Sequence, residues 1–296
     1  MRNPDNQMKN FSLLCICAAI LLTSCKEDKE PQLVFKFRFD STQVRLNNIG
    51  QPQSIPSDHR AQNPKFNSIS AHYIELAPDA WTALGSGEVL YTAPQTSAGG
   101  SSAIDFNQAV KVAEGETFFS VPLSDIAPGT YDWIRVSLAY QNYDVRYKIN
   151  TPAVYQGTGT IASFIGFNTY ITNYMINTQS MTVNGNRLQG YWGFETTVPG
   201  FSPVVFDGQA PPGATTVPNP LSATSPIPAG SCVVTGPFTS ALTITGNETE
   251  DIVITLSLST NGSFEWKEND GNNYYEPADG DTVVDMGIRG LIPIVE

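Results

Sequence analysis

Apolar and polar residues alternate along much of this chain, a pattern typical of strands with one buried face. Four apolar residues from Leu33 to Phe39 share one face, and Lys36 and Arg38 take the other. Comparable apolar runs predict further strands over residues 68–76, 88–91, 117–123 and 161–171. We therefore expect an all-β domain.

The strand expected after residue 130 alternates most fully. The sequence Ala127-Pro128-Gly129-Thr130 predicts a tight turn in which Gly129 takes a positive φ. In the strand that follows, the inward residues are Ile134, Val136, Leu138 and Tyr140, and the outward ones are Trp133, Arg135 and Ser137.

Two Asn-Gly pairs predict hairpins. A two-residue turn at Asn184-Gly185 places Met181 opposite Leu188. At the second pair, a three-residue loop over 260–262 pairs Leu258 with Phe264 and keeps the apolar residues on one face. Gly262 then supplies the left-handed backbone that such a loop needs.

Three segments are expected to be irregular. Residues 47–64 contain three prolines and predict a loop, and residues 96–102 predict a Gly/Ser turn. Residues 197–230 hold eight prolines and four glycines. We interpret residues 32–296 as a single β-rich domain with a long Pro/Gly-rich excursion, and a boundary between two β units at 197–230 is the alternative.

Composition sharpens the fold class and excludes one kind of partner. The chain has 41% hydrophobic and 15% charged residues, with 24 glycines and 21 prolines, which favours short strands joined by turns over helices. We expect an antiparallel β-sandwich. The formal net charge is −12, and an acidic surface repels phosphate backbones, so nucleic acid is not an expected partner.

The N-terminus has the features of an export signal. Arg2 and Lys9 precede an apolar run over residues 11–22. As a helix this run would span roughly 18 Å, which is short of a hydrocarbon core of about 30 Å. Residues 1–24 are therefore predicted to be a cleaved signal peptide.

The residues around Cys25 resemble those of a known class of lipoproteins. Leu22-Thr23-Ser24-Cys25 resembles the lipobox of bacterial lipoproteins, and residues 25–30 (CKEDKE) resemble the surface-export tag of Bacteroidota lipoproteins. The resemblance implies acylation of Cys25, for instance by palmitate, a charged tether over 25–31, and attachment to the outer membrane. The export tag favours the cell surface, and the periplasmic face of the outer membrane is the alternative. Two or three acyl chains make such an anchor effectively permanent.

The remaining cysteines predict no internal disulfide. Cys15 and Cys17 lie in the predicted signal peptide, which leaves Cys232 beside Val233 and Val234. We expect Cys232 to be a packing residue rather than a reactive thiol.

Residues 268–279 resemble a degenerate calcium loop of the EF-hand type. Calcium takes six to eight hard oxygen ligands, and a twelve-residue loop supplies them from positions 1, 3, 5, 7, 9 and 12. These positions hold Glu268, Asp270, Asn272, the Tyr274 carbonyl, Glu276 and Asp279. Asn273 occupies position 6, where a sharp turn is needed. A solvated acidic turn is the alternative interpretation.

Support for catalysis is weaker. The chain has two histidines, His59 and His72, and lacks a G-x-S-x-G elbow, a P-loop and an H-E-x-x-H motif. A glycosidase needs only two carboxylates, and nothing in the sequence marks such a pair. Aromatic and amide residues are mixed at 140–143 and at 167–174, a composition suited to glycan binding as well as to ordinary strands.

The layout also resembles the MbnP-like lipoproteins. The shared features are the Phe-rich strand at 34–39, residues 70–76 and Pro128-Gly129-Thr130-Tyr131 before a strand. The resemblance implies a β-sandwich and, for some members, copper. Copper would need clustered His, Met or Cys, and these residue types show no ligand spacing here.

Taken together, we expect a non-enzymatic, lipid-anchored binding or surface-structural module of the outer membrane, with calcium as a candidate structural ion and a glycan or an envelope protein as partner. A copper-handling lipoprotein is the second hypothesis and a glycan-active enzyme the third.

Overall fold

The computed structural model describes residues 30–150, 153–210 and 232–296. Residues Pro31–Glu296 form one compact unit. The predictions for the signal peptide, Cys25 and most of the tether lie outside the described residues. This unit is all-β, and its one short helical turn in the described part is η1 (Leu123–Asp125).

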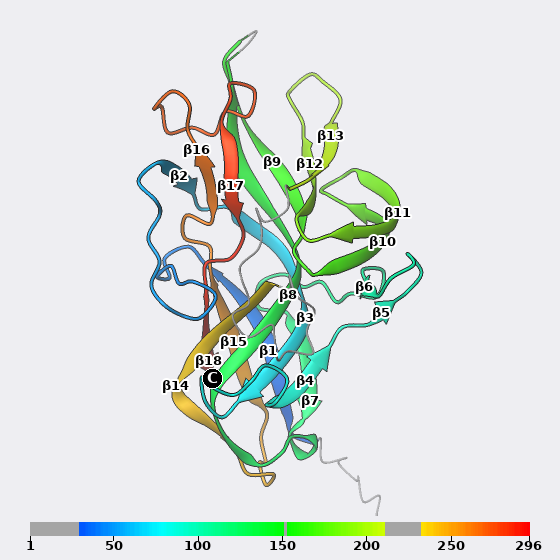
Figure 1. Cartoon of the computed structure of the whole chain (residues 1–296), viewed down its shortest axis with the longest axis vertical. Coiled ribbons are helices and arrows are strands. Elements are labelled where there is room, and N and C mark those ends of the chain that lie inside the picture. The colour runs from blue at the N-terminus through cyan, green and yellow to red at the C-terminus, as the bar shows by residue number, and fades with distance from the viewer. Residues whose placement is uncertain (1–29, 151–152, 211–231) are drawn as a thin grey trace, which may run out of the picture. The chain divides into compact units, whose positions relative to one another are not determined.

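The strands form four sheets (Figure 1). The first sheet has the order β18 (Leu291–Val295), β15 (Ile252–Ser259), β1 (Gln32–Asp40) and β7 (Thr117–Pro122). The central sheet has the order β13 (Val204–Gln209), β12 (Tyr191–Thr196), β9 (Tyr155–Phe164), β8 (Gly129–Ile149), β3 (Lys65–Ala77) and β4 (Glu88–Thr92), and β14 (Cys232–Ile244) also pairs with β8. The third sheet has β11 (Ser180–Leu188), β10 (Asn168–Met175), β6 (Ala103–Asp105) and β5 (Gln95–Thr96), and the fourth has β17 (Thr282–Met286), β16 (Phe264–Lys267) and β2 (His59–Gln62).

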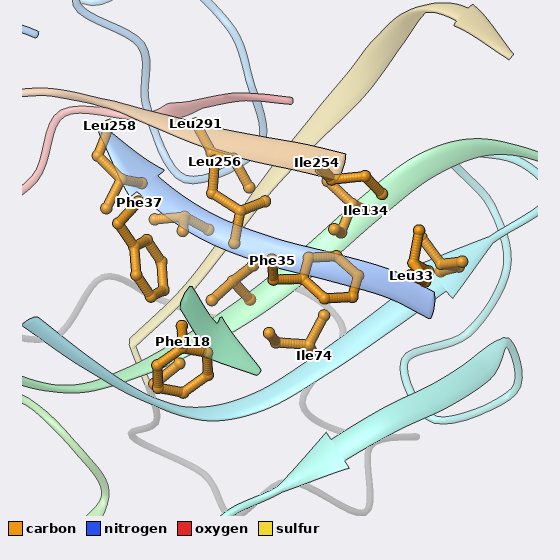
Figure 2. Packing of buried hydrophobic residues seen from close by; sticks show 14 of the residues in the cluster. Leu33, Phe35, Phe37, Ile74, Phe118, Ile134, Ile254, Leu256, Leu258 and Leu291 are labelled. Atoms are coloured by element: carbon orange, nitrogen blue, oxygen red, sulfur yellow. The ribbon is translucent and has the colours of Figure 1, made fainter. Parts of the chain in front are cut away.

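The largest core lies between the first sheet and one half of the central sheet (Figure 2). Leu33, Phe35 and Phe37 of β1 are fully buried there, as the alternation at 33–39 predicts. They pack with Ile134 of β8 and Leu256 of β15. Most strand pairs are antiparallel, but β1 and β15 run parallel.

Strand β8 is buried on both faces, which corrects the predicted inward and outward sets. Arg135 and Ser137 were expected to point outward, yet they are 1% and 0% exposed. A register shift against β3, from Leu138 to Tyr140, adds one residue to β8. Such a bulge changes the phase of the alternation, so Tyr140 belongs to a different cluster from Val136 and Leu138.

Both predicted Asn-Gly hairpins are wrong. Residues 184–185 lie inside β11, which pairs with β10, and Asn184 takes φ 49° at a bulge rather than in a turn. Strand β15 pairs with β1 and β18, whereas β16 pairs with β17 and β2. Gly262 does take the expected positive φ of 56°, but the chain there passes from one sheet to another.

The structure also corrects local predictions at a turn, at two loops and at one strand. Gly129 does not take a positive φ, because it begins β8 and pairs with Ile244. The loop predicted at 47–64 contains β2, and the strand predicted at 161–171 breaks between Phe164 and Asn168. The Pro/Gly-rich excursion at 197–230 contains β13, and its residues after 210 lie outside the described part.

Candidate functional site

A polar groove of about 840 Å³ lies between the central sheet and the third sheet. In Figure 1, β9, β10 and β11 lie in the upper half of the picture, and the long strand β8 runs through both halves. Residues from β3, β8, β9 and β10 line the groove, together with the loop after β6. Its lining residues are Asn67, Ser68, Phe106, Asn107, Lys111, Tyr140, Asn142, Asp144, Thr158, Thr160, Asn173, Tyr174, Met175, Ile176 and Asn177.

One wall is a hydrogen-bonded row of side chains on β3, β8 and β9. The Asn67 amide donates to the Oδ1 atoms of both Asn142 and Asp144, at 3.0 Å each. The Thr160 hydroxyl donates to Asp144 at 2.8 Å, and the Asn142 amide donates to the Ile176 carbonyl at 2.8 Å. These bonds fix the side-chain positions before any ligand arrives.

The other wall comes from β10 and the loop after β6. Asn173 and Met175 are exposed on β10, and Asn107 and Lys111 are exposed on the loop. The Lys111 ammonium donates to the Ala109 carbonyl at 3.0 Å and lies 4.3 Å from the centre of the Phe106 ring. Desolvation lowers the pKa of Lys111 below its usual value.

A buried carboxylate holds the turn at the rim of the groove. Glu195 of β12 is 3% exposed and accepts hydrogen bonds from the backbone N–H groups of Asn177, Thr178 and Gln179. Burial alone would raise the pKa of Glu195, but these bonds and the Thr178 hydroxyl lower it overall. The β10–β11 turn is therefore a fixed edge of the groove.

The aromatic residues of the groove serve mainly as its floor. Tyr140 and Tyr174 are 4% and 2% exposed and pack against Phe164 in one cluster. Burial raises the pKa of Tyr140 to about 12, so it stays neutral. These rings leave little face for a ligand to stack on.

A second depression, which we name the tyrosine depression, shares Thr158 with the groove. Its volume is about 790 Å³. Tyr274, which lines it, is 47% exposed, and the Lys148 ammonium lies 5.2 Å from the centre of that ring. Arg146, Gln156 and Asn273 add polar groups. This depression supplies the exposed ring face that the groove lacks.

The predicted calcium loop is folded by its own hydrogen bonds. Asn273 takes φ 65°, as its place at position 6 requires. Glu268 pairs with Arg60 at 3.0 Å and accepts the Asn273 N–H. Asp270 accepts both the backbone N–H and the side-chain amide of Asn272.

The two remaining acids of the loop face donors from β8 and the residue after it. Glu276 is 1% exposed, pairs with Lys148 at 2.7 Å and accepts the Asn150 amide at 2.8 Å. The Lys148 hydrogen bond holds the pKa of Glu276 at about 2. Asp279 accepts the Asn150 amide at 2.9 Å. Calcium would have to displace these donors, and its binding stays a prediction.

Across the described residues, no group of three or more His, Cys, Asp or Glu side chains is placed to hold a metal ion. His72 is buried beside Phe167, and burial lowers its pKa to about 4. His59 contacts Glu265 at 3.1 Å. Met181 and Met286 pack against different clusters. The copper hypothesis therefore has no assembled ligand set in this part of the chain.

Sequence reasoning found part of the groove. It singled out residues 140–143 and 167–174, and the structure brings Tyr140, Asn142, Asn173 and Tyr174 of these segments together. It missed Asn67, Lys111 and Asp144. These are single polar residues on separate elements, and no local pattern distinguishes them from ordinary surface residues.

Within the described residues, no helix has the length and apolar character needed to cross a bilayer. Comparison with known proteins found no matching family model, no matching curated protein and no matching solved structure.

Proposed function

We propose that this chain is a lipid-anchored, non-enzymatic binding module of the bacterial outer membrane, and that its polar groove binds a neutral glycan. One observation carries the proposal. Tyr140 and Asn142 of one aromatic and amide segment, and Asn173 and Tyr174 of another, line a single groove with other polar side chains from separate elements.

The chemistry of the groove suits sugar hydroxyls. Each amide side chain offers both a donor and an acceptor, and each threonine hydroxyl does the same. Asp144 and Lys111 are the charged residues among the described lining, one of each sign, so the groove favours an uncharged polar ligand. The tyrosine depression extends the surface past Thr158 and offers the exposed face of Tyr274 to a further sugar ring.

The small number of carboxylates in the groove favours binding over hydrolysis. Glycoside hydrolysis generally uses two carboxyl groups about 5 to 9.5 Å apart across the scissile bond. Asp144 is the one carboxylate among the described residues that line the groove, and the described lining of the tyrosine depression has none. Asp144 is itself held by Asn67 and Thr160.

The anchor part of the proposal rests on the sequence, on the lipobox-like residues 22–25 and the charged residues that follow Cys25. Acylation of Cys25 and export by these charged residues remain part of the proposal.

Glycan binding is tested by isothermal titration calorimetry against a panel of neutral oligosaccharides, selected first on a glycan array. The variant Asn173→Ala/Lys111→Ala removes two exposed lining groups and should weaken binding at least tenfold. Asn247→Ala, an exposed asparagine outside the groove, is the matched control and should bind like the wild type. The absence of binding to any glycan, or equal binding by all three proteins, would refute the glycan proposal.

The anchor is tested separately. Mass spectrometry of the membrane-extracted protein should find an acylated N-terminal Cys25, and Cys25→Ala should release the protein from the membrane fraction. An unmodified N-terminus would refute the anchor and leave the groove proposal intact.

A further inference from the structure

A second cavity, the apolar pocket, lies on the other side of the central sheet. Its volume is about 650 Å³, within the usual range for sites of small organic ligands. It opens between the β12–β13 hairpin and the fourth sheet, which Figure 1 shows near one another in the upper half of the picture.

One wall of the apolar pocket is a run of large side chains on one face of β12 and β13. Trp192 and Phe194 of β12 contact Phe206 of β13, with ring centres 5.8 Å and 5.0 Å apart. Val204 pairs with Thr196 on the same face. Because β13 is the last strand of the central sheet in its described part, this wall reaches the edge of the sheet.

The opposite wall comes from β16, β17 and the loop between them. Phe264 and Tyr275 pack with ring centres 5.0 Å apart, and Val283 and Met286 pack against the same cluster. The two walls therefore belong to different sheets, so the pocket is a cavity between two folded elements rather than a flat surface patch.

Among the described residues, two large apolar side chains of the pocket are left partly exposed. Val204 and Phe206 line it, and each is 47% exposed. Neighbouring large apolar side chains left exposed in a concave site are typical of ligand or partner contacts. Their burial by a ligand would remove apolar surface from water, which is the main driving force of such binding.

The polar groups of the pocket show which ligand it would take. The Tyr147 hydroxyl and Thr196 hydroxyl bond each other at 2.8 Å, and the Gln209 amide donates to the Gln189 carbonyl at 2.8 Å. Asp285 pairs with Arg289 at 2.8 Å. No lysine or arginine is among the described lining residues, so an anionic head group would find no counter-charge and would meet the carboxylate of Asp285.

We propose that the apolar pocket binds a neutral, lipid-like small molecule through its hydrocarbon part. The proposal is independent of glycan binding in the polar groove, because the pocket and that groove share no lining residue. The pocket does share Tyr147 and Tyr275 with the tyrosine depression.

The test uses the whole chain after the predicted cleavage site with Cys25 replaced by serine, which keeps the compact unit Pro31–Glu296 and removes the lipid. The uncharged dye N-phenyl-1-naphthylamine is the probe, and its fluorescence should rise to saturation with one site per chain. Dodecanol should displace the dye at a concentration at least tenfold lower than dodecanoate at pH 8. Equal displacement by the two would overturn the proposed neutral class.

Two phenylalanine variants locate the site. Phe206→Asp places a charge in the pocket wall and should weaken dye binding at least tenfold. Phe201→Asp changes a phenylalanine that is 72% exposed and does not line the pocket, so it should bind the dye like the wild type. Near-ultraviolet circular dichroism and the urea midpoint establish that both variants are folded.

Two results would overturn the proposal itself. One is the absence of saturable dye binding by the wild-type chain. The other is equal dye binding by the wild type and Phe206→Asp. If the dye does not bind and sedimentation shows a dimer that Phe206→Asp dissociates, a second copy of the chain covers the pocket instead.

Discussion

The substitution Glu265→Gln tests how the fourth sheet is held in place. Glu265 of β16 has a side chain that is 4% exposed and accepts from the Arg45 guanidinium. It also contacts Arg289 at 3.3 Å and His59 at 3.1 Å. Burial alone would raise the pKa of Glu265, but the His59 and Arg45 hydrogen bonds lower it overall. Glutamine keeps the volume of the side chain and removes its charge.

The expected loss of stability follows from what the substitution leaves behind. Arg45 and Arg289 have side chains 8% and 7% exposed, so both guanidinium groups would stay buried without their shared carboxylate. Removing one partner of a buried ion pair costs about 3 to 5 kcal/mol. We expect the lower end, about 3 kcal/mol, because Asp285 still pairs with Arg289 at 2.8 Å.

The measurement is urea unfolding followed by tryptophan fluorescence. With a denaturant slope of about 3 kcal/mol/M, the midpoint should fall by about 1 M. Lys267→Gln is the matched control, because Lys267 lies on the same strand, two residues after Glu265, and its ion pair with Asp58 is exposed. Exposed pairs contribute little, so the control should keep the wild-type midpoint. An equal midpoint for Glu265→Gln and the wild type would refute the importance of the buried cluster.

Three further predictions concern acid stability, the free thiol and the candidate calcium loop. The Lys148 hydrogen bond lowers the pKa of Glu276 from 4.5 to about 2. The ionised carboxylate therefore stabilises the fold fully above pH 4.5, and this contribution is lost as the pH falls toward 2, because protonation then favours the unfolded chain. In Glu276→Gln, the free energy of unfolding should change less with pH between 4.5 and 2 than in the wild type. Burial raises the pKa of Cys232 to about 12, so its reaction with Ellman's reagent at pH 8 should be slow in the native protein and fast in urea, and equal rates would contradict this. Calcium binding by residues 268–279 requires Lys148 to leave Glu276, so Lys148→Met should raise calcium affinity in a calorimetric titration; the absence of binding in both proteins would refute the calcium hypothesis.

The local character of most strands follows from the residue pattern. Side chains alternate across a strand with a period of two, so the burial of Leu33, Phe35 and Phe37 could be predicted from their spacing alone. The left-handed backbone at Gly262 and Asn273 could also be predicted, because few residues adopt that conformation without strain.

Strand pairing, in contrast, depends on contacts between segments far apart in the sequence. The residues after Leu258 were predicted to turn back on their own strand, but β15 instead pairs with β1, more than 200 positions earlier in the sequence. A period of two predicts which face of a strand is buried, but it does not predict which strand pairs with it. The pattern therefore does not distinguish a hairpin from a connection between two sheets. The burial of Arg135 could not be predicted from its own strand either, because it depends on the pairing of Arg135 with Glu75 of another strand.

The candidate sites divide in the same way. The aromatic and amide composition of residues 140–143 and 167–174 was visible in the sequence, and it indicated the chemistry of the polar groove. Its shape required the β8 bulge, the pairing of β10 with β11 and the side chains of Asn67, Lys111 and Asp144. The apolar pocket had no sequence signal, because Trp192, Phe206 and their neighbours have the composition of any buried strand, and only the spacing between two sheets leaves them uncovered.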